Sequence, residues 1–571
     1  MASIAEPAAA LAPFDAAVAN RDASGTQHDR TAQWGANHIA WTLLAVAGIA
    51  AGVYLRITQL STQILLDDEW HAIHKLLHSD VKGIVTSFGV ADYSIPLTLY
   101  YRLLAHHGGL SEWGMHLPLL VAGIALLALA PLLLRREVAP AVGATWIALL
   151  AVSPLLVYLS RTARPYALTC LLAFVAVVAF RNWWRRAPHA IGWASLYVVA
   201  TALAGWLHPI TLPFTLLPFA YYAIVTFASP RERDGRRPML RLLCLGAAVA
   251  IPLVVALAPP IIANTAQLTG KAGTDSVTLD SAYRTALLMA GFASPWALAV
   301  ESALFVAGIV RFARRDTDFV AYIAVLCIGT AIAIVVARPA WIQHPLVFAR
   351  YMLPALPFAL LFVAEGAVGV VARIRRPIVG VVAVAFATLL LFRIGPIPGY
   401  LYFPNQFMGH ARFQFDYDDA HNPYVLEIPH EPMPAFYREL AKRPPGSVTL
   451  IEAPWRLESN FIPFPWYQAV HRQYVKIGLV TPVCGVRDFG EYPPGATGLR
   501  LRNFVHLTDV LAGKNAGAGY LVMHRKAWKT PPDAVVDWPD VDACLPAIVA
   551  KLGAPIYRDE SIVVFDLGAH R

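Results

Sequence analysis

Apolar runs of the length that an α-helix needs to cross a bilayer, about 20 residues, recur through the first 393 residues of the chain. They lie at 38–56, 115–134, 139–159, 165–180, 190–207, 209–228, 239–260, 286–310, 319–337, 348–372 and 377–393. Hydrophobic residues make up 57% of the chain and charged residues 15%, against about 25% charged residues in soluble domains. So few charges cannot cover so much apolar surface in water. The composition therefore argues against a soluble enzyme, a disordered chain, a coiled coil or a nucleic-acid-binding protein, and it predicts an α-helical polytopic membrane bundle with about 11 transmembrane helices.

Arginines in short loops mark the cytoplasmic side of such a bundle. The turns after the second, fourth, sixth, eighth and tenth runs are rich in arginine, and the short turns between them are not. These arginines are Arg135, Arg136, Arg181, Arg185, Arg186, Arg231, Arg233, Arg236, Arg237, Arg241, Arg311, Arg314, Arg315, Arg373, Arg375 and Arg376. The alternation predicts a cytoplasmic N-terminus and an extracytoplasmic C-terminal region. Residues 1–37 lack the ordered segments of a cleavable signal, so we expect a disordered cytoplasmic tail before the transmembrane domain at 38–393.

Two regions do not fit a membrane span. The first outer loop, 57–114, has apolar residues at helical spacing in segments too short and too polar to cross, as in interfacial helices. Residues 394–571 carry more charge and β-rich runs at 447–451, 473–479, 519–523 and 561–565, which predict an extracytoplasmic α/β domain. Cys484 and Cys544 lie in that domain, where a disulfide is permitted, so we expect a bridge between them. Cys170, Cys244 and Cys327 in the spans are expected to be packing residues.

Acidic residues follow the first span closely. Asp67, Asp68 and Glu69 can either cap the next helix or supply a general base or metal-binding carboxylate at the outer interface. A further acid, Asp92, begins the next loop segment. His71, His74 and His78 share one helical face, which suits either a metal site or the polar face of an interfacial helix.

Cationic residues gather at the same face. Arg161 and Arg164 precede Pro165 and Tyr166 at an outer helix start, where a phosphate can bind, although lipid-headgroup contacts are the alternative. Others at outer ends of spans are His208, Lys271, Arg338, His344, Arg350 and Tyr351. Cations opposite acids suit transfer from an anionic lipid-phosphate donor. No nucleotide-binding or zinc-protease motif is present, so the energy must come with the substrate or from an ion gradient.

The motifs "DDE", "YSIPLTLYY", "SRTARPYAL" and "FARYMLPALP", in this order, resemble those of the GT-C superfamily. These are integral-membrane glycosyltransferases that use polyprenyl-phosphate sugars, and the resemblance is to the bacterial branch related to protein O-mannosyltransferases and the lipid A aminoarabinose transferase. It covers about 1–395 and implies a place in the bacterial inner (cytoplasmic) membrane. One departure is Tyr93-Ser94-Ile95-Pro96-Leu97, because many relatives have a basic residue before the prolines.

The resemblance implies roles for Asp68, Arg164, Tyr166, Arg350 and Tyr351, and the charges gathered at the outer face add the remaining candidates. Asp68 takes the place of the catalytic acid, with Asp67 and Glu69 as neighbouring candidates, and we expect burial and Asp67 to raise its pKa. The donor phosphate would contact Arg161, Arg164, Tyr166, Lys271, Arg350 and Tyr351. The remaining substrate would contact Asp92, Tyr93, His208 and His344. The reaction would invert the sugar onto the hydroxyl of a lipid, glycan or protein acceptor, and the use of a divalent metal stays open.

Two functions of other kinds also fit parts of the sequence. A secondary transporter would explain the many spans and the intramembrane Glu301 and Glu365. A polyprenyl-lipid flippase or scaffold would keep the outer cations but would not need Asp68. Neither the sugar nor the acceptor is named by any motif in the chain.

Overall fold

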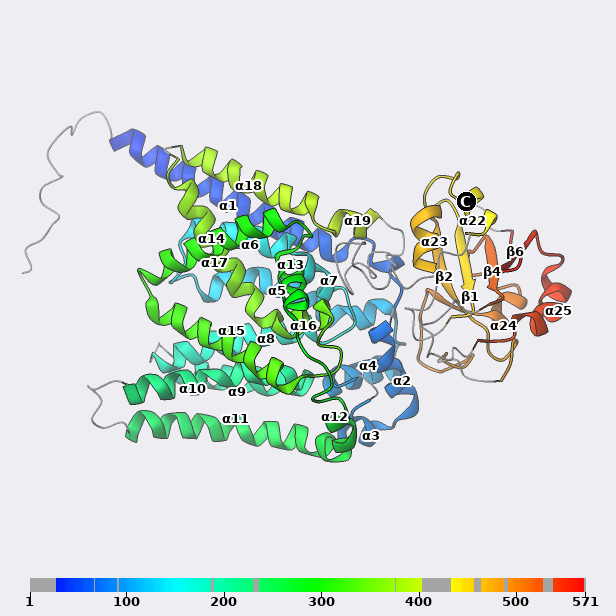
Figure 1. Cartoon of the computed structure of the whole chain (residues 1–571), viewed down its shortest axis with the longest axis horizontal. Helices are drawn as coiled ribbons and strands as arrows, with labels where there is room; N and C mark the ends of the chain where they lie inside the picture. The colour runs from blue at the N-terminus through cyan, green and yellow to red at the C-terminus, as the bar shows by residue number, and fades with distance from the viewer. Residues whose placement is uncertain are drawn as a thin grey trace, which may run out of the picture.

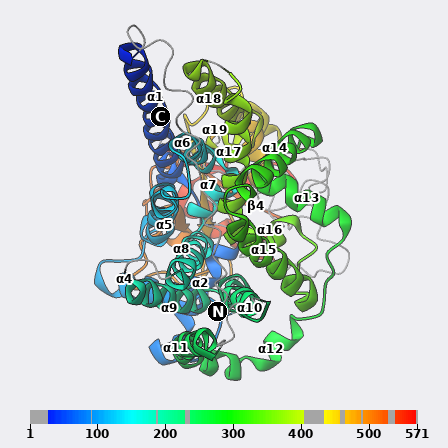
Figure 2. The same ribbon diagram turned by 90° about the vertical axis from the view of Figure 1, so that its left-hand side faces the viewer.

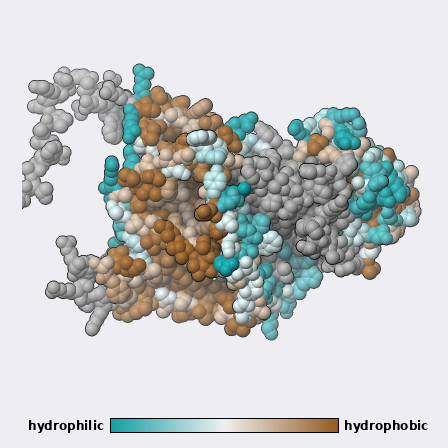
Figure 3. Space-filling model, in the orientation of Figure 1, coloured by the Kyte–Doolittle hydropathy of each residue, from teal (hydrophilic) through white to brown (hydrophobic). Residues whose placement is uncertain are grey.

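The computed structural model describes residues 27–65, 67–89, 92–185, 189–228, 236–374, 376–402, 433–455, 464–486, 491–526 and 538–568. A helical bundle carries a set of short helices at one end, and a C-terminal domain built on a sheet lies beyond them (Figure 1). Hydrophobic side chains cover much of the bundle surface, and hydrophilic ones gather where the short helices lie (Figure 3). The predicted fold class is confirmed.

The long helices follow the apolar runs. Within the described residues, nine helices are long and apolar enough to cross a membrane, or ten if a broken pair bent by 59° counts as one span, and one shorter apolar helix follows. The helices of the bundle are α1 (Gln27–Ile57), α5 (Glu112–Leu133), α6 (Pro140–Val152), α7 (Pro154–Ser160), α8 (Tyr166–Trp184), α9 (Ala190–Leu207), α10 (Leu212–Ala228), α11 (Arg236–Ala263), α14 (Pro295–Ala313), α15 (Thr317–Ala337), α16 (Pro345–Met352), α17 (Leu356–Val371) and α18 (Pro377–Ile394).

Three boundaries differ from the sequence prediction. The run 139–159 is the broken pair α6–α7, which bends at Pro154, a residue without a backbone N–H for the helix ladder. The run 286–310 is divided between α13 (Leu279–Ala290) and α14, because Gly291 takes a left-handed conformation with φ of 98°. Helix α1 begins at Gln27, so the last part of the expected disordered tail is helical, and residues 1–26 lie outside the described residues.

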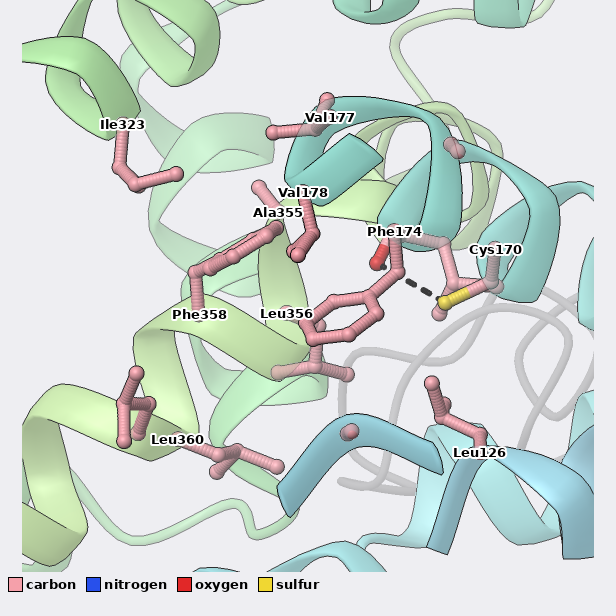
Figure 4. Close-up of a cluster of buried hydrophobic side chains, with 14 of the residues drawn as sticks. Leu126, Cys170, Phe174, Val177, Val178, Ile323, Ala355, Leu356, Phe358 and Leu360 are labelled. Atoms are coloured by element: carbon pink, nitrogen blue, oxygen red, sulfur yellow. Dashed lines mark hydrogen bonds between the residues drawn. The ribbon is translucent and has the colours of Figure 1, made fainter. Parts of the chain in front are cut away.

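The bundle core is built around α8, which lies inside the ring of other helices (Figure 2). Phe174 of α8 stacks on Phe358 of α17 with ring centroids 4.9 Å apart, among aliphatic neighbours, and the Cys170 thiol lies 3.6 Å from the Leu353 carbonyl oxygen (Figure 4). Helices α14 and α17 approach most closely at Gly308 and Gly366. A Cβ atom at either glycine would lie within 2.0 Å of a backbone oxygen of the other helix, so only glycine permits this crossing.

Arginine-bearing turns lie together at one end of the bundle. Arg181 at the end of α8 pairs with Glu137 and with Asp316, which precedes α15, and Arg185 pairs with Asp316 and Asp318. The short helices lie at the other end. They are η1 (Leu60–Thr62), η2 (Asp67–Glu69), α2 (Trp70–His78), α3 (Val81–Thr86), α4 (Ile95–His107), η3 (Pro209–Thr211), α12 (Thr265–Gly270), η4 (Leu353–Ala355) and α19 (Ile397–Tyr402).

The C-terminal domain contains a six-stranded sheet of order β3-β2-β1-β4-β6-β5. The strands are β1 (Thr449–Ala453), β2 (Tyr474–Leu479), β3 (Phe504–His506), β4 (Tyr520–His524), β5 (Tyr557–Arg558) and β6 (Ile562–Asp566). Strands β3, β2, β1 and β4 are parallel, and β6 is antiparallel to β4 and β5. All four β-rich runs named from the sequence are therefore strands.

Helices cover both faces of this sheet. They are α22 (Ala435–Leu440), α23 (Phe464–His471), α24 (Leu507–Leu511) and α25 (Val541–Leu552). Helix α25 carries Cys544, and a disulfide joins it to Cys484, the cysteine expected to be its partner. Their sequence separation is 60 residues, so the bond closes a long loop across the domain.

Candidate functional site

Asp68 lies in η2, at the end of the bundle opposite the arginine-bearing turns. Its Oδ2 atom accepts a hydrogen bond of 2.7 Å from Nη1 of Arg350, and Nη2 of Arg164 lies 3.8 Å from the same oxygen. Arg164 also donates to the Asp68 carbonyl oxygen at 3.2 Å. The Asp68 side chain is 28% exposed, and both guanidiniums are more buried than the carboxylate. Three segments far apart in sequence thus place two cations around one accessible acid.

The neighbouring acids take different positions. Glu69 is buried, and its Oε1 atom accepts a hydrogen bond of 2.6 Å from the backbone N–H of Ala163 and lies 3.0 Å from Nε2 of His116. The Asp67 side chain lies outside the described residues. Of the predicted acidic group, Asp68 is therefore the described carboxylate that faces the cations, whereas Glu69 holds the turn before Arg164.

The electrostatic prediction for Asp68 is wrong in this state. Burial raises the pKa of its carboxyl group, but the charges of Arg164 and Arg350 outweigh burial and hold that pKa below its usual value. Burial lowers the pKa of the His71 imidazole to about 4, against the attraction of Asp68, so His71 is neutral at pH 7. The sequence could not anticipate this, because neither arginine is near Asp68 along the chain.

Aromatic rings surround the two arginines. The Arg350 guanidinium carbon lies 5.2 Å from the centroid of the Tyr166 ring and 5.8 Å from that of Tyr351. The His208 ring lies within 6 Å of the rings of Tyr93, Tyr166 and Tyr351. Nζ of Lys271 lies 5.7 Å from the Tyr93 ring. We call Tyr93, Tyr166, His208, Lys271, Arg350 and Tyr351 the basic–aromatic cluster; all six were predicted as site residues.

His208 is neutral within this cluster. Burial, together with Arg164 and Arg350, lowers the pKa of its imidazole to about 3. Its Nδ1 atom accepts a hydrogen bond of 3.4 Å from the Ile210 backbone N–H. A neutral ring with that nitrogen occupied can present its other nitrogen as a donor.

Asp92 and His344 lie beside the cluster rather than within it. The buried Asp92 carboxylate accepts hydrogen bonds from the Thr98 hydroxyl at 2.7 Å and the Ser94 backbone N–H at 3.2 Å, and so holds the start of α4. Burial raises the pKa of this carboxyl group. His344 precedes α16, and its ring stacks on Trp341 at 5.2 Å.

Arg161 has a different place from the one predicted. Its Nη1 atom donates to the backbone carbonyl oxygens of Leu55, Arg56 and Thr58, at 3.0, 3.2 and 2.6 Å. These carbonyls belong to the last turn of α1 and the residue after it, and a cation there offsets the negative end of the helix dipole. Arg161 is fully buried and caps the C-terminal end of α1. It is therefore not one of the phosphate ligands proposed for this site.

The histidines of α2 do not form a metal centre. His74 and His78 stack with centroids 5.6 Å apart, and Nδ1 of His78 lies 2.9 Å from the His74 carbonyl oxygen. In the part of the chain that the structure describes, no group of three or more His, Cys, Asp or Glu side chains could hold a metal ion.

Two buried residues that support the site were not among those predicted from the sequence. His116, one turn into α5, contacts Glu69, and Glu112 at the start of α5 accepts backbone hydrogen bonds from Arg502 and Asn503. Both side chains are buried. The available signal was an acid and a histidine four residues apart at the start of an otherwise apolar run.

The acids that favoured a transporter have other surroundings. Glu365 is buried and accepts charge-assisted hydrogen bonds from Arg311 and Arg315, each at 2.7 Å, at the end of the bundle opposite Asp68. It therefore belongs to the arginine-bearing end. Glu301 lies on α14 and is half-buried.

No protein-family model matches the chain, and no curated protein is significantly similar to it in sequence. Solved structures that it is similar to include ArnT from Cupriavidus metallidurans in the apo state, at 15% identity over 93% of this chain and 98% of that one, with a TM-score of 0.43. The same protein bound to undecaprenyl phosphate is similar at 16% identity over the same shares, with a TM-score of 0.42. The apo oligosaccharyltransferase of Archaeoglobus fulgidus is similar at 12% identity over 76% of this chain and 64% of that one, with a TM-score of 0.42. At identities this low and with TM-scores below 0.5, these similarities carry no conclusion about the function of this chain.

Proposed function

We propose that this chain is a membrane glycosyltransferase of the GT-C type, which moves a sugar from a polyprenyl-phosphate donor to a hydroxyl acceptor at the outer face of the bacterial cytoplasmic membrane. The observation that carries the proposal is the pairing of Asp68 with Arg350 and Arg164, next to the basic–aromatic cluster. An acid, two cations and a set of rings meet at one end of an apolar bundle. A lipid-linked phosphosugar needs such a place, because its tail prefers the bilayer and its phosphate does not.

The two arginines suit a phosphate. Guanidinium groups present paired N–H donors that match phosphate oxygens, and burial strengthens the attraction. In the structure, the Asp68 carboxylate accepts a hydrogen bond from Arg350 and lies 3.8 Å from Nη2 of Arg164. In our proposal the donor phosphate takes the place of Asp68 on Arg350 and Arg164.

That exchange would also prepare the base. Once the arginine charges are paired with phosphate, the main cause that lowers the pKa of Asp68 is removed, and burial then acts to raise that pKa. The acceptor hydroxyl oxygen attacks the anomeric carbon as its proton passes to Asp68, and the bond from that carbon to the phosphate oxygen breaks with inversion. The arginines stabilise the negative charge left on the polyprenyl phosphate.

The rings suit the sugar. Tyr93 and His208 offer apolar faces with polar edges, which can pack on a sugar ring and bond to its hydroxyl groups. The relatives' basic residue before the prolines is missing here, and Lys271, from another part of the chain, brings a cation to the Tyr93 ring instead. We propose that Lys271 contacts the phosphate end of the donor.

The membrane orientation follows from the loops. The arginine-bearing end would face the cytoplasm, which leaves Asp68 and the C-terminal domain outside it. Undecaprenyl-type phosphosugars are the donor class that this orientation implies, and the acceptor would be a lipid, glycan or protein.

The test is transfer by the purified chain in detergent or nanodiscs. A set of short-chain polyprenyl-phosphate sugars is offered with hydroxyl acceptors, and the release of polyprenyl phosphate is measured. We expect Asp68→Asn to abolish release while the protein still folds and binds the lipid. Asp80→Asn is the matched control, because Asp80 lies on the same outer loop and caps α3 through the Gly83 backbone N–H.

This assay, together with lipid movement measured in sealed proteoliposomes, separates the alternatives. Full transfer by Asp68→Asn would remove Asp68 from the reaction. A flippase would move labelled lipid between leaflets without releasing polyprenyl phosphate, and it would do so equally well with Asp68→Asn.

A further inference from the structure

The C-terminal domain is joined to the segment that carries Asp68 by buried polar contacts. The Glu112 carboxylate, at the start of α5, accepts hydrogen bonds from the backbone N–H groups of Asn503 at 2.9 Å and Arg502 at 3.0 Å. Nδ2 of Asn503 donates to the Gln63 carbonyl oxygen at 2.8 Å. These side chains are at most 6% exposed, so water does not compete for the bonds.

Aromatic packing joins the same two parts. Trp70, two residues after Asp68, is 1% exposed. Its ring lies 4.6 Å from that of Trp455, which follows β1, and 4.8 Å from that of Phe504 in β3. Leu110 also forms two backbone hydrogen bonds with the domain: its N–H donates to the Gly498 carbonyl oxygen at 2.6 Å, and its carbonyl oxygen accepts the Arg500 N–H at 2.7 Å.

From this interface, hydrogen bonds lead to the two segments that carry Asp68 and Arg164. Gln63 connects Asn503 to the segment of Arg161. Its carbonyl oxygen accepts the bond from Asn503, and its Nε2 atom donates to the Arg161 carbonyl oxygen at 2.7 Å. The His116 ring connects Glu112 to Glu69. Its Nδ1 atom lies 2.6 Å from the backbone carbonyl oxygen of Glu112, and its Nε2 atom lies 3.0 Å from the Glu69 carboxylate.

One hydrogen bond then sets the spacing of the site. Glu69 accepts the Ala163 backbone N–H at 2.6 Å. Glu69 follows Asp68 in sequence, and Ala163 precedes Arg164. The two ends of this bond are therefore the immediate neighbours of the proposed base and of one proposed phosphate ligand.

We propose that the C-terminal domain is a positioning part of the active site, acting through Glu112, Asn503 and Trp70 to hold Asp68 at its distance from Arg164. This rests on the function proposed above. Glu112 and Asn503 are positioning residues, since among the described contacts they are joined to the reacting groups through Gln63, His116 and Glu69. The bundle and the domain then form one catalytic unit, and the domain has a role whichever acceptor it meets.

The first test needs no substrate. Hydrogen–deuterium exchange is measured for the peptides around 67–76 and 161–166 in the wild type, Glu112→Gln and Asn503→Ala, all as the full chain. We expect faster exchange in both peptides for both variants, because each loses a contact between the C-terminal domain and Glu112 or Gln63, the residues through which the domain is joined to these segments.

The matched control is Glu452→Gln. Glu452 is also a buried carboxylate of the same chain, but its partners are Tyr437 and His524 inside the C-terminal domain. It should lower thermal stability and leave exchange around Asp68 unchanged. Equal exchange in all proteins, or the same increase with Glu452→Gln, would overturn the positioning role.

The second test is kinetic. We expect Glu112→Gln and Asn503→Ala to lower kcat on the order of 10- to 100-fold, since a displacement of about 1 Å has such an effect, with the donor KM changed much less. Glu452→Gln should keep the wild-type kcat. Faster exchange in Glu112→Gln and Asn503→Ala with wild-type kcat in both would overturn the proposal. Because exchange is read without transfer, the coupling between domain and Asp68 segment is decided even if the chain transfers no sugar and the proposed function fails.

Discussion

If the donor phosphate replaces the Asp68 carboxylate on Arg350 and Arg164, then removing the negative charge of Asp68 should tighten the binding of the lipid phosphate. In the structure, Oδ2 of Asp68 occupies Nη1 of Arg350 at 2.7 Å and attracts Arg164 at 3.8 Å. A phosphate must replace this carboxylate before it can bind both guanidiniums. Asp68→Asn keeps the shape of the side chain and removes the competing charge.

The magnitude follows from the contacts that compete. A hydrogen bond to a charged group contributes about 1.5–3 kcal/mol. Only Arg350 makes one with the Asp68 carboxylate, and that side chain is 28% exposed, so solvent weakens the competition. We therefore take the lower end, about 1.5 kcal/mol, which corresponds to roughly tenfold tighter binding.

Arg350→Gln should act in the opposite direction. It removes a phosphate ligand, so binding should weaken about 10- to 100-fold, for a bond of about 1.5–3 kcal/mol. The two substitutions at one ion pair therefore have opposite signs. If both arginines merely contacted lipid headgroups, neither variant would change the affinity for polyprenyl phosphate.

The assay is a titration of a short-chain polyprenyl phosphate against purified protein in detergent, by calorimetry or by ligand-induced thermal stabilisation. It is repeated between about pH 5 and pH 8. Because the arginines hold the pKa of Asp68 below its usual value of about 3.9, the carboxylate stays ionised and competing through this range. The advantage of Asp68→Asn should therefore persist, and the second ionisation of the phosphate, near pH 6, affects both proteins alike.

One result would refute the reasoning. If Asp68→Asn weakens binding as much as Arg350→Gln does, the carboxylate attracts the phosphate instead of competing with it. It could do so only through a bridging cation, which a chelator and added Mg²⁺ or Mn²⁺ would reveal. That outcome would answer the metal question in favour of a divalent ion.

Three further predictions concern the fold. Gly366→Ala should destabilise the bundle by about 1–3 kcal/mol or more in thermal unfolding, because the new Cβ atom would lie 2.0 Å from the Leu304 backbone oxygen. Gly143→Ala is the control and should be tolerated, because a Cβ atom there meets nothing within 4 Å. Cys544→Ser should lower the stability of the C-terminal domain by about 4 kcal/mol, from the loop of 60 residues that the disulfide closes; unchanged unfolding in the variant or under reducing conditions would contradict it. A reporter fused after residue 571 should be active only outside the cytoplasm, and activity confined to the cytoplasm would show that the arginine alternation was misread.

Several parts of this protein follow from local sequence alone. The length and apolarity of each run determine a span, because a buried helix must satisfy its backbone internally and present apolar side chains to lipid. The four β-rich runs are all strands for the same kind of reason, since their alternation with turns is a local property. The motifs also led to Asp68, Arg164 and Arg350, which the structure brings together.

The division of roles among neighbouring residues was decided by the tertiary structure. Arg161 and Arg164 are the same residue type three positions apart, yet Arg161 caps the end of α1 and Arg164 faces Asp68. Asp68 and Glu69 are adjacent acids, yet one is accessible and the other is buried against Ala163. Local sequence cannot separate such pairs, because the direction of each side chain depends on elements about 100 residues away.

The electrostatics and the link to the C-terminal domain were likewise settled only in three dimensions. The pKa of Asp68 is lowered by the charges of Arg164 and of Arg350, which donates to it from 282 residues away in sequence. Glu112 meets the N–H of Asn503 across 391 residues. Helical periodicity and hydropathy carry information over one or two turns of chain, whereas charge pairing and buried hydrogen bonds depend on distance in space, which only the packed bundle and its docked domain determine.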